Sequence, residues 1–213
     1  MTHIKRQNTR KNWPIPRKGG TFIINSGNKG IPVLVLLRDM LKVARTRKEV
    51  KRAILEKNIL VCGKTIKDER KNVELFDTLS LVPSKEDYRL TLSKNGKYML
   101  EKIKHNEREA KISKIINKKT LKGKKIQINL SDGRNYLTNL RCSTNDSVMI
   151  DFSKNKIEKC LPLEEKSNVF IIGGKHAGKI GIIKKINEKL KIAEILENQQ
   201  RINVLIKQLM VIE

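Results

Sequence analysis

The stretch from Pro32 to Lys67, PVLVLLRDMLKVARTRKEVKRAILEKNILVCGKTIK, decides how the rest of the chain is interpreted. Its first part predicts a helix, because Leu34, Leu37 and Leu41 recur at the spacing of one apolar helical face. Pro32 stands where the first turn of a helix tolerates proline. We therefore expect a first helix from this proline onward.

A capping box predicts the start of a second helix. Thr46 is followed three residues later by Glu49, so the hydroxyl can accept from the helix backbone while the carboxylate reaches back to the cap. Val50, Ala53 and Ile54 then supply the buried stripe of this helix. Cations crowd the exposed side of the helix pair, namely Arg38, Lys42, Arg45, Arg47, Lys48, Lys51 and Arg52.

A tight hairpin is expected after the helices, because residues 59–61 and then Thr65 and Ile66 flank Cys62 and Gly63. Taken alone, a helix pair with a solvated basic face indicates only a soluble surface. The order of helix, short loop, basic helix and hairpin, however, resembles the αL RNA-binding module named after ribosomal protein S4. That resemblance implies that Lys64 and the cations of the two helices contact structured RNA.

The charge balance of the chain favours a polyanionic partner. The sequence has 47 Lys and Arg against 22 Asp and Glu, which gives a net charge of +25. Either a polyanionic partner neutralises this charge or the fold tolerates strong self-repulsion. Hydrophobic residues make up 38% of the 213 positions. This composition suits several small cores better than one large core.

Membrane insertion, disulfides and metal binding are not indicated. No apolar run approaches the roughly 20 residues of a membrane span, and residues 1–20 lack an apolar signal region, so we expect a cytosolic protein. Cys62, Cys142 and Cys160 are odd in number, far apart and not in CxxC pairs. We interpret them as reduced thiols, and we expect no metal site and no cofactor.

The first twenty residues are basic and contain no acid. Like-charge repulsion should leave such a segment extended in isolation, and threading along phosphates would order it. A disordered basic tail is the alternative. Trp13, followed by Pro14 and Pro16, instead favours a docked turn. The cations of this arm that we assign to RNA are Lys5, Arg6, Arg10, Lys11, Arg17 and Lys18.

Strands are expected over residues 72–103, broken at Pro83 and at an Asn95–Gly96 turn, and they should complete the first small domain. Beyond them, residues 102–125 contain ten lysines or arginines and only two acidic residues, Glu107 and Glu109. We interpret this run as a second basic surface. Its residues assigned to RNA are Lys118, Lys119, Lys122 and Lys124.

A compact β domain is predicted next. Apolar residues alternate over residues 126–130 and again over residues 148–152. Asp132 and Gly133 give the first hairpin its turn, and Lys154 with Asn155 gives the second.

Two interpretations compete for residues 169–186. Gly173, four residues, Gly178 and Lys179 fit a phosphate-binding P-loop, but Ile180 replaces the magnesium-binding Ser or Thr, and the Ile-rich stretch after Gly181 favours a strand over the required helix. The alternative is a loop between two strands of a small barrel, which resembles the KOW motif. The residues that would then face RNA are Lys175, His176, Lys179, Lys184 and Lys185.

His3, Lys5, Arg6 and Trp13, with the basic helices after them, resemble the opening of the archaeal and eukaryotic (e) type of ribosomal protein S4. That family, as the resemblance implies, has the same order of basic arm, αL module, central β domain and KOW barrel. The expected fold is therefore α+β and multi-domain: a basic N-terminal arm at 1–32, an αL RNA-binding module with following strands at 33–103, a central small β domain at 104–165 and an SH3-like KOW barrel at 166–213.

The expected function is that of a structural protein of the small ribosomal subunit, which binds ribosomal RNA beside neighbouring ribosomal proteins and catalyses nothing. Duplex RNA is recognised mainly through phosphates, 2′-hydroxyls and shape, which suits an excess of lysine. The eight aromatics are scattered through expected core positions, which disfavours a stacking platform for single strands. We expect no membrane contact and no small-molecule substrate.

Two rival functions stay open at this point. An RNA-modifying enzyme that carries an αL module would need a catalytic domain, for which Asp132 is the nearest candidate, although Asp-Gly is also a strong turn signal. A KOW-type transcription factor would need an exposed apolar patch for its polymerase. Co-purification with ribosomes or with polymerase separates the ribosomal protein from the transcription factor.

Overall fold

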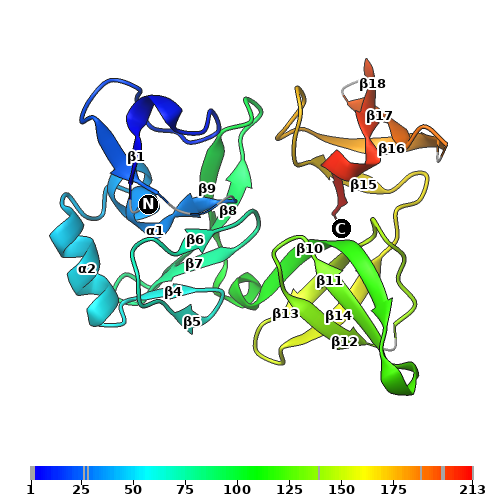
Figure 1. Cartoon of the computed structure of the whole chain (residues 1–213), viewed down its shortest axis with the longest axis horizontal. Helices are drawn as coiled ribbons and strands as arrows, with labels where there is room; N and C mark the ends of the chain where they lie inside the picture. The colour runs from blue at the N-terminus through cyan, green and yellow to red at the C-terminus, as the bar shows by residue number, and fades with distance from the viewer. Residues whose placement is uncertain are drawn as a thin grey trace. The chain divides into compact units, whose positions relative to one another are not determined.

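The structure is a computed structural model that describes residues 3–25, 27, 29–138, 140–187, 189–197 and 200–212. It is mostly antiparallel β-sheet with two short helices (Figure 1). The contacts divide the chain into two compact units, residues 1–92 with 97–109 and residues 93–96 with 110–213. None of the helices in the described ranges is long and apolar enough to cross a membrane. The finer division into four domains stays a prediction.

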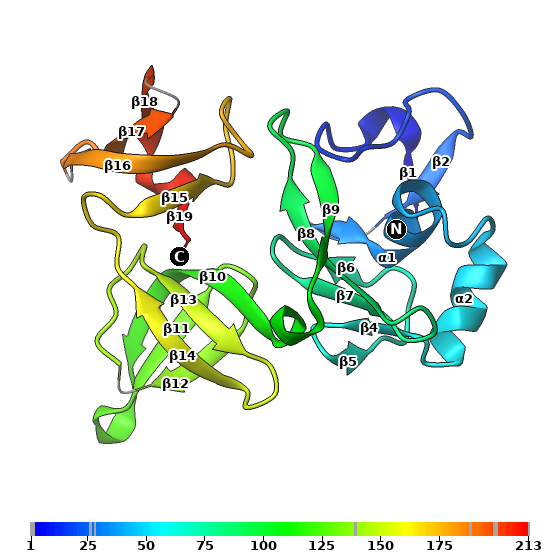
Figure 2. The ribbon, with the colours of Figure 1, turned by 180° about the vertical axis from the view of Figure 1, so that it is seen from behind.

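A five-stranded antiparallel sheet organises the first unit, in the order β5-β4-β7-β8-β9. Figure 2 shows its strands from behind: β4 (Ile59–Val61), β5 (Lys64–Thr65), β7 (Thr78–Leu81), β8 (Glu86–Leu92) and β9 (Tyr98–Ile103). Two strand pairs accompany this sheet, namely β1 (His3–Lys5) with β2 (Phe22–Ile24) and β3 (Ile31–Pro32) with β6 (Asn72–Val73). The predicted breaks at Pro83 and at Asn95–Gly96 are confirmed, because both lie between strands of the sheet.

The first helix is more deeply buried than an amphipathic pattern predicts. It consists of α1 (Val33–Val35), which continues directly into the π-helical turn η2 (Leu36–Met40). Every residue from 33 to 37 is at most 3% exposed. Pro32 has extended backbone (φ −69°, ψ 146°) and precedes the helix, so its expected place in the first helical turn is wrong by one residue.

The second helix, α2 (Arg47–Leu55), begins at the predicted capping box. Thr46 Oγ1 accepts from the Glu49 backbone N–H at 3.3 Å, and the Glu49 carboxylate accepts from the Arg45 backbone N–H at 2.8 Å. Val50 and Ile54 are buried, as the sequence predicts. The capping box is therefore confirmed, with the carboxylate reaching one residue further back than the cap itself.

The hairpin that follows is also confirmed. Val61 pairs with Lys64, so Cys62 and Gly63 form a two-residue loop with positive φ angles of 50° and 72°. Both central residues of the tight hairpin turns that suit strand twist need such angles. Cys62 is buried and its thiol donates to Asp77 Oδ1 at 3.0 Å, which ties the loop to the sheet.

The N-terminal segment is folded, and the expectation that it stays extended without RNA is wrong for residues 3–25. The guanidinium of Arg6, in η1 (Arg6–Asn8), donates to the carbonyl oxygens of Pro16 at 2.9 Å and Gly20 at 2.6 Å. Trp13 is 5% exposed and its indole N–H donates to the Gly30 carbonyl at 3.1 Å. The docked turn is therefore confirmed. The hydrogen bonds of Arg6 and the buried ring of Trp13 hold a segment that has few apolar residues of its own.

The second unit begins with a five-stranded antiparallel sheet in the order β12-β11-β10-β13-β14. Its strands are β10 (Ala110–Thr120), β11 (Ile126–Leu130), β12 (Asn135–Thr138), β13 (Ser147–Asp151) and β14 (Lys156–Leu161). The long strand β10 pairs with β13 along its first half and with β11 along its second. A bulge between Ile115 and Asn117 separates the halves, and bulges bend a strand, so the sheet curls around its own core.

A second sheet forms the C-terminal part of this unit, in the order β18-β17-β16-β15-β19. Its strands are β15 (Asn168–Ile171), β16 (Ile180–Asn187), β17 (Ile192–Glu197), β18 (Gln200–Leu205) and β19 (Leu209–Val211). The loop of residues 172–179 joins two antiparallel strands and no helix follows it. A P-loop places its phosphates at a helix N-terminus, so the geometry excludes that interpretation. Three 3₁₀ turns complete the described elements of the chain: η3 (His105–Glu109), η4 (Lys122–Lys124) and η5 (Ile206–Gln208).

Two lysines of the basic run over residues 102–125 are internal. Lys111 is 3% exposed and its ammonium contacts Asp132 at 3.0 Å. Lys114 is 4% exposed and its ammonium donates to the carbonyl oxygens of Ile206 and Leu209. The interpretation of the whole run as a surface is therefore wrong at these two positions, because the β10 strand is covered on both faces there.

Candidate nucleic-acid interface

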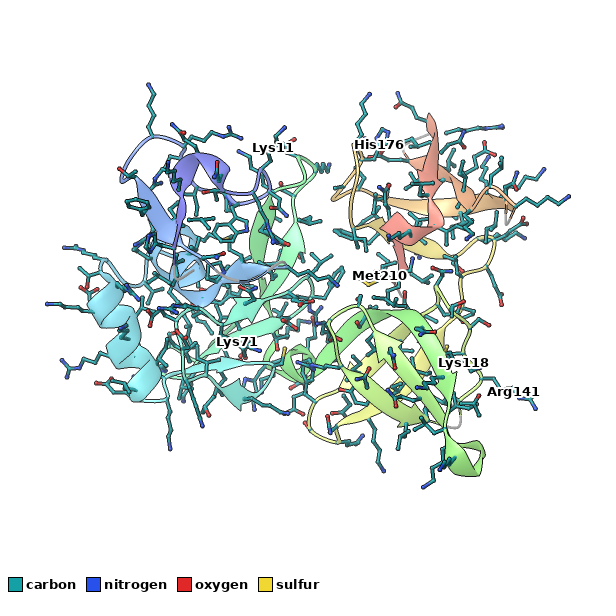
Figure 3. All side chains as sticks on the ribbon, in the orientation of Figure 1. Lys11, Lys71, Lys118, Arg141, His176 and Met210 are labelled. Carbon is teal, nitrogen blue, oxygen red and sulfur yellow. The ribbon has the colours of Figure 1, made fainter. Side chains whose placement is uncertain are left out.

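The exposed side of α2 is a dense cationic surface. Arg47, Lys48, Lys51 and Arg52 stand three or four residues apart in two neighbouring rows, a spacing that brings side chains together on a helix. The side chains of Arg47 and Lys51 are 52% and 54% exposed, and that of Arg52 is 82% exposed. Figure 3 shows nitrogen-tipped side chains projecting from α2. We call these four residues the α2 face.

The carboxylates near the α2 face already have partners. Glu49 caps the helix, and hydrogen bonds from the Arg45 backbone and the Thr46 hydroxyl lower the pKa of that carboxyl. Glu56 accepts from Arg52 at 2.8 Å. Glu69, which is nearly buried, accepts from Arg47 Nε at 2.9 Å. These acids orient two arginines, and Lys48 has no ion pair among the residues that the structure describes.

The cations around the α2 face differ in how they are held. Arg38 forms an ion pair with Asp39 at 2.9 Å and is 31% exposed. Lys42 is exposed and adopts a left-handed backbone (φ 56°) where the first helix ends. Arg45 and, on strand β5, Lys64 are exposed as well. All four lie in the same compact unit as the α2 face.

The cations of the N-terminal arm divide into structural and exposed groups. Arg6 holds carbonyl oxygens of its own loop, and Arg10 donates to the Gly27 carbonyl at 3.0 Å. The exposed members are Lys5, Lys11, Arg17 and Lys18. A cavity of about 410 Å³ lies among these residues, and its cationic lining is Arg6, Arg10, Lys11, Arg17 and Lys97.

In the second unit, Lys118 and Lys119 lie at the far end of β10 and Lys122 lies in η4, all exposed. The Lys118 ammonium donates to the Cys142 carbonyl at 3.0 Å, next to Arg141, which is exposed and was not expected from the sequence (Figure 3). The side chain of Lys124 lies outside the described residues. These cations lie where the central strand β10 ends.

The cations of the C-terminal sheet cluster on the 172–179 loop and on β16. Lys175, Lys184 and Lys185 are exposed, and His176 is half-buried. Lys179 is 29% exposed and its ammonium contacts Glu197 at 2.7 Å, so its charge already has a partner. Gly181 lets β16 approach β17, because a Cβ there would lie 2.5 Å from Ile195 Cγ2.

We expected the aromatic residues at core positions, and this expectation is wrong for Phe22. Phe22 is 58% exposed and meets His3 edge-on, with ring centroids 4.8 Å apart. Strand alternation could have indicated this exposure. Successive side chains point to opposite faces of a sheet, so Phe22 lies on the other face from the buried Ile23. Arg70 is a second residue to which no sequence pattern pointed. It lines a cavity together with Arg38 and Arg47.

Asp132, the residue nearest to a catalytic candidate, lies in a hairpin turn. Asp132 accepts from Lys111 and from the Arg134 backbone N–H at 3.1 Å, which are the contacts of a hairpin turn. Within residues 3–25, 27, 29–138, 140–187, 189–197 and 200–212, no three His, Cys, Asp or Glu side chains are grouped so that they could hold a metal ion.

Comparisons with known proteins match two segments of the chain and its fold. The model of ribosomal family S4e matches residues 84–157, and the model of the KOW motif matches residues 165–199. The KOW interpretation of the 172–179 loop is thereby confirmed. The fold resembles the crystal structure of the 30S ribosomal protein S4e from Thermoplasma acidophilum, with a TM-score of 0.75 and 22% identity over 87% of this chain and 95% of that chain.

Curated relatives cover most of the chain. The small ribosomal subunit protein eS4 of Methanocella arvoryzae is 37% identical over 190 residues, which are 86% of this chain and 80% of the relative. The protein of the same name from Nanoarchaeum equitans is 36% identical over 191 residues, 86% of this chain and 82% of the relative.

Proposed function

The chain belongs to ribosomal family S4e, and from this membership we propose that it is a non-enzymatic structural constituent of the small ribosomal subunit, acting in translation. Its partners are then ribosomal RNA and neighbouring ribosomal proteins. The observation that carries the RNA contact is the α2 face, where cations stand in two rows while the nearby carboxylates are already engaged.

The proposed mechanism is electrostatic and geometric. Duplex RNA is recognised chiefly through phosphates, 2′-hydroxyls and shape, and a folded surface of Lys and Arg provides the matching charge. Residues 33–103 act as an αL module, in which the exposed cations of both helices and Lys64 of the hairpin contact the same RNA. Arg38 and Arg47 each have an acid partner that fixes the guanidinium, so they position the RNA with little loss of side-chain freedom.

The other basic surfaces add to this contact. The folded N-terminal segment offers Lys5, Lys11, Arg17 and Lys18, and the far end of β10 offers Lys118, Lys119 and Lys122. The C-terminal sheet acts as an SH3-like KOW barrel, whose contribution is Lys175, His176, Lys184 and Lys185. We assign Lys179 and Arg6 mainly to internal support, since each already holds groups of its own unit.

The test of this proposal is incorporation into small subunits. A tagged chain is expressed in cells, lysates are fractionated on sucrose gradients with and without a high-salt wash, and the chain is quantified by mass spectrometry. Stoichiometric and salt-resistant presence in the small subunit is expected. Accumulation in light fractions or with RNA polymerase would contradict it and favour the enzyme or the transcription factor.

A paired variant tests the α2 face itself. Lys48→Gln with Lys51→Gln removes two charges without touching the capping box, and Lys85→Gln with Lys156→Gln removes two exposed charges elsewhere. Affinity of the purified chain for small-subunit RNA should fall by about one decade or more in the α2 pair, and the dependence of log K on log salt should become shallower by about 1 to 2. Equal losses in both pairs would show that charge acts without regard to position.

A further inference from the structure

A cavity of about 460 Å³ lies in the first unit between the β1–β2 strand pair and the two helices. We call it the arginine pocket, and its lining includes His3, Phe22, Leu34, Arg38, Arg47 and Arg70. Its volume falls in the range of sites that hold one small molecule or one group of a larger ligand. Nothing in the proposed electrostatic contact requires such a hollow.

One wall of the arginine pocket is apolar and aromatic. The ring of Phe22 is 58% exposed although the protein has only eight aromatic residues, and His3 contacts it edge-on at an interplanar angle of 74°. Leu34, which is 3% exposed, closes the wall from α1. An exposed ring on an apolar wall suits a flat ligand, because stacking does not depend on the identity of the base.

Another part of the lining is cationic and held in place. Asp39 accepts from both Nε and Nη2 of Arg38, at 3.2 Å and 2.9 Å, and Glu69 accepts from both Nε and Nη2 of Arg47. Each guanidinium has five N–H donors, so donors are left over for a ligand. This part of the lining is therefore built before any ligand arrives.

Arg70 adds a third cation to the lining of the pocket. Its Nε is buried and has no hydrogen-bond partner among the residues that the structure describes. Buried donors without partners are uncommon and unfavourable in native proteins, and this one belongs to a side chain that lines the pocket. The positive charge of the Arg70 guanidinium, which lines the pocket, suits a bound anion.

We propose that the arginine pocket receives one unpaired nucleotide of the bound RNA, with the base against Phe22 and a phosphate against Arg70 and Arg47. The proposal rests on the proposed function and deepens it, because it adds recognition of an extruded base to recognition of the duplex. Sequence-specific RNA recognition commonly uses such splayed bases, which stack on aromatic or guanidinium groups. The same chemistry would fit a free mononucleotide, which the experiment separates.

The experiment measures binding of the full chain to two RNA duplexes that are identical except that one carries an additional, unpaired 2-aminopurine. Tighter binding of the bulged duplex is expected, together with a change in 2-aminopurine fluorescence. Phe22→Leu keeps an apolar side chain and removes the ring, and should lower the preference for the bulge by about 5- to 100-fold. Its affinity for the paired duplex and its melting temperature should match those of Val82→Ala, a control at another exposed apolar position.

Arg70→Met is the second variant. It should weaken binding of the bulged duplex while leaving the melting temperature of the free chain unchanged or higher, because it deletes a donor that has no partner in the free protein. A purely structural Arg70 would instead lower the melting temperature and leave the bulge preference intact, which overturns its part in the site.

The outcomes separate this proposal from the proposed function. Binding of neither duplex would contradict RNA binding itself. Equal binding of both duplexes, unchanged by Phe22→Leu, would overturn the pocket and leave the proposed function standing. AMP binding as tight as that of the bulged duplex would overturn the assignment to RNA in favour of a free mononucleotide.

Discussion

The ammonium group of Lys114 donates a hydrogen bond to the carbonyl oxygen of Leu209 at 2.8 Å, across 95 positions of the sequence. It also donates to Ile206, so one lysine of β10 contacts both the first residue of the 3₁₀ turn η5 and the first residue of β19. Burial lowers the pKa of Lys114 to about 8. The charged form is therefore less stable in the folded chain than in the unfolded one.

The first prediction follows from this pKa. Because the unfolded chain binds more protons than the folded chain between about pH 8 and the ordinary lysine pKa of 10.5, the free energy of unfolding should rise with pH in that window, by up to about 3 kcal/mol. Below pH 8 both states are protonated and the contribution should be flat. Chemical denaturation at a series of pH values measures it.

Other lysines also titrate at high pH, so Lys114→Met is the control for this prediction. It removes the titrating group, and the difference in unfolding free energy between the two proteins should change over the same window. A constant difference from pH 7 to pH 10.5 would show that Lys114 is protonated normally.

Lys42 gives a prediction about backbone strain. Its φ of 56° lies in the left-handed region, which a Cβ disfavours. Lys42→Gly should raise the free energy of unfolding by about 1 kcal/mol relative to Lys42→Ala, which keeps the Cβ and loses the same charge. Both variants should lose the same amount of RNA affinity. Equal stability of the two variants would mean that the strain is relieved elsewhere.

The cap of α2 gives a third prediction. Thr46→Ala removes the oxygen that accepts from the Glu49 backbone N–H, and should lower the free energy of unfolding by about 1 kcal/mol. Thr46→Ser keeps that oxygen and should lose little. Thermal unfolding of the three proteins measures the order, and the ranking fails if serine is as destabilising as alanine.

The thiols give a fourth prediction. Burial, followed by the contact with Cys142, raises the pKa of Cys160 to about 12. The thiolate is the reactive form, so Cys160 should react with iodoacetamide at pH 8 at least about 100-fold more slowly in the folded chain than in denaturant. Peptide mapping by mass spectrometry measures both rates in one sample. Rapid labelling of folded protein would contradict the burial of this group.

Local features of the fold were predictable because neighbours in the sequence produce them. The Thr46 cap and the Cys62–Gly63 hairpin depend on residues within a few positions, and both are confirmed. The KOW loop was distinguished from a P-loop by Ile180 and by the strand after it. Which cations contact RNA stays a prediction.

The sequence by itself determined the strong positive charge, the two helices, the turns and the strand alternation, since these depend on composition and on short-range steric preference. Only the tertiary structure decided which charges are available. Lys111, Lys114 and Lys179 look like other surface lysines in the sequence, yet each meets an acceptor brought from 18 to 95 positions away. Phe22 and Arg70 likewise meet at one cavity because the fold unites distant segments. Burial and pairing are long-range properties, and no local pattern records them.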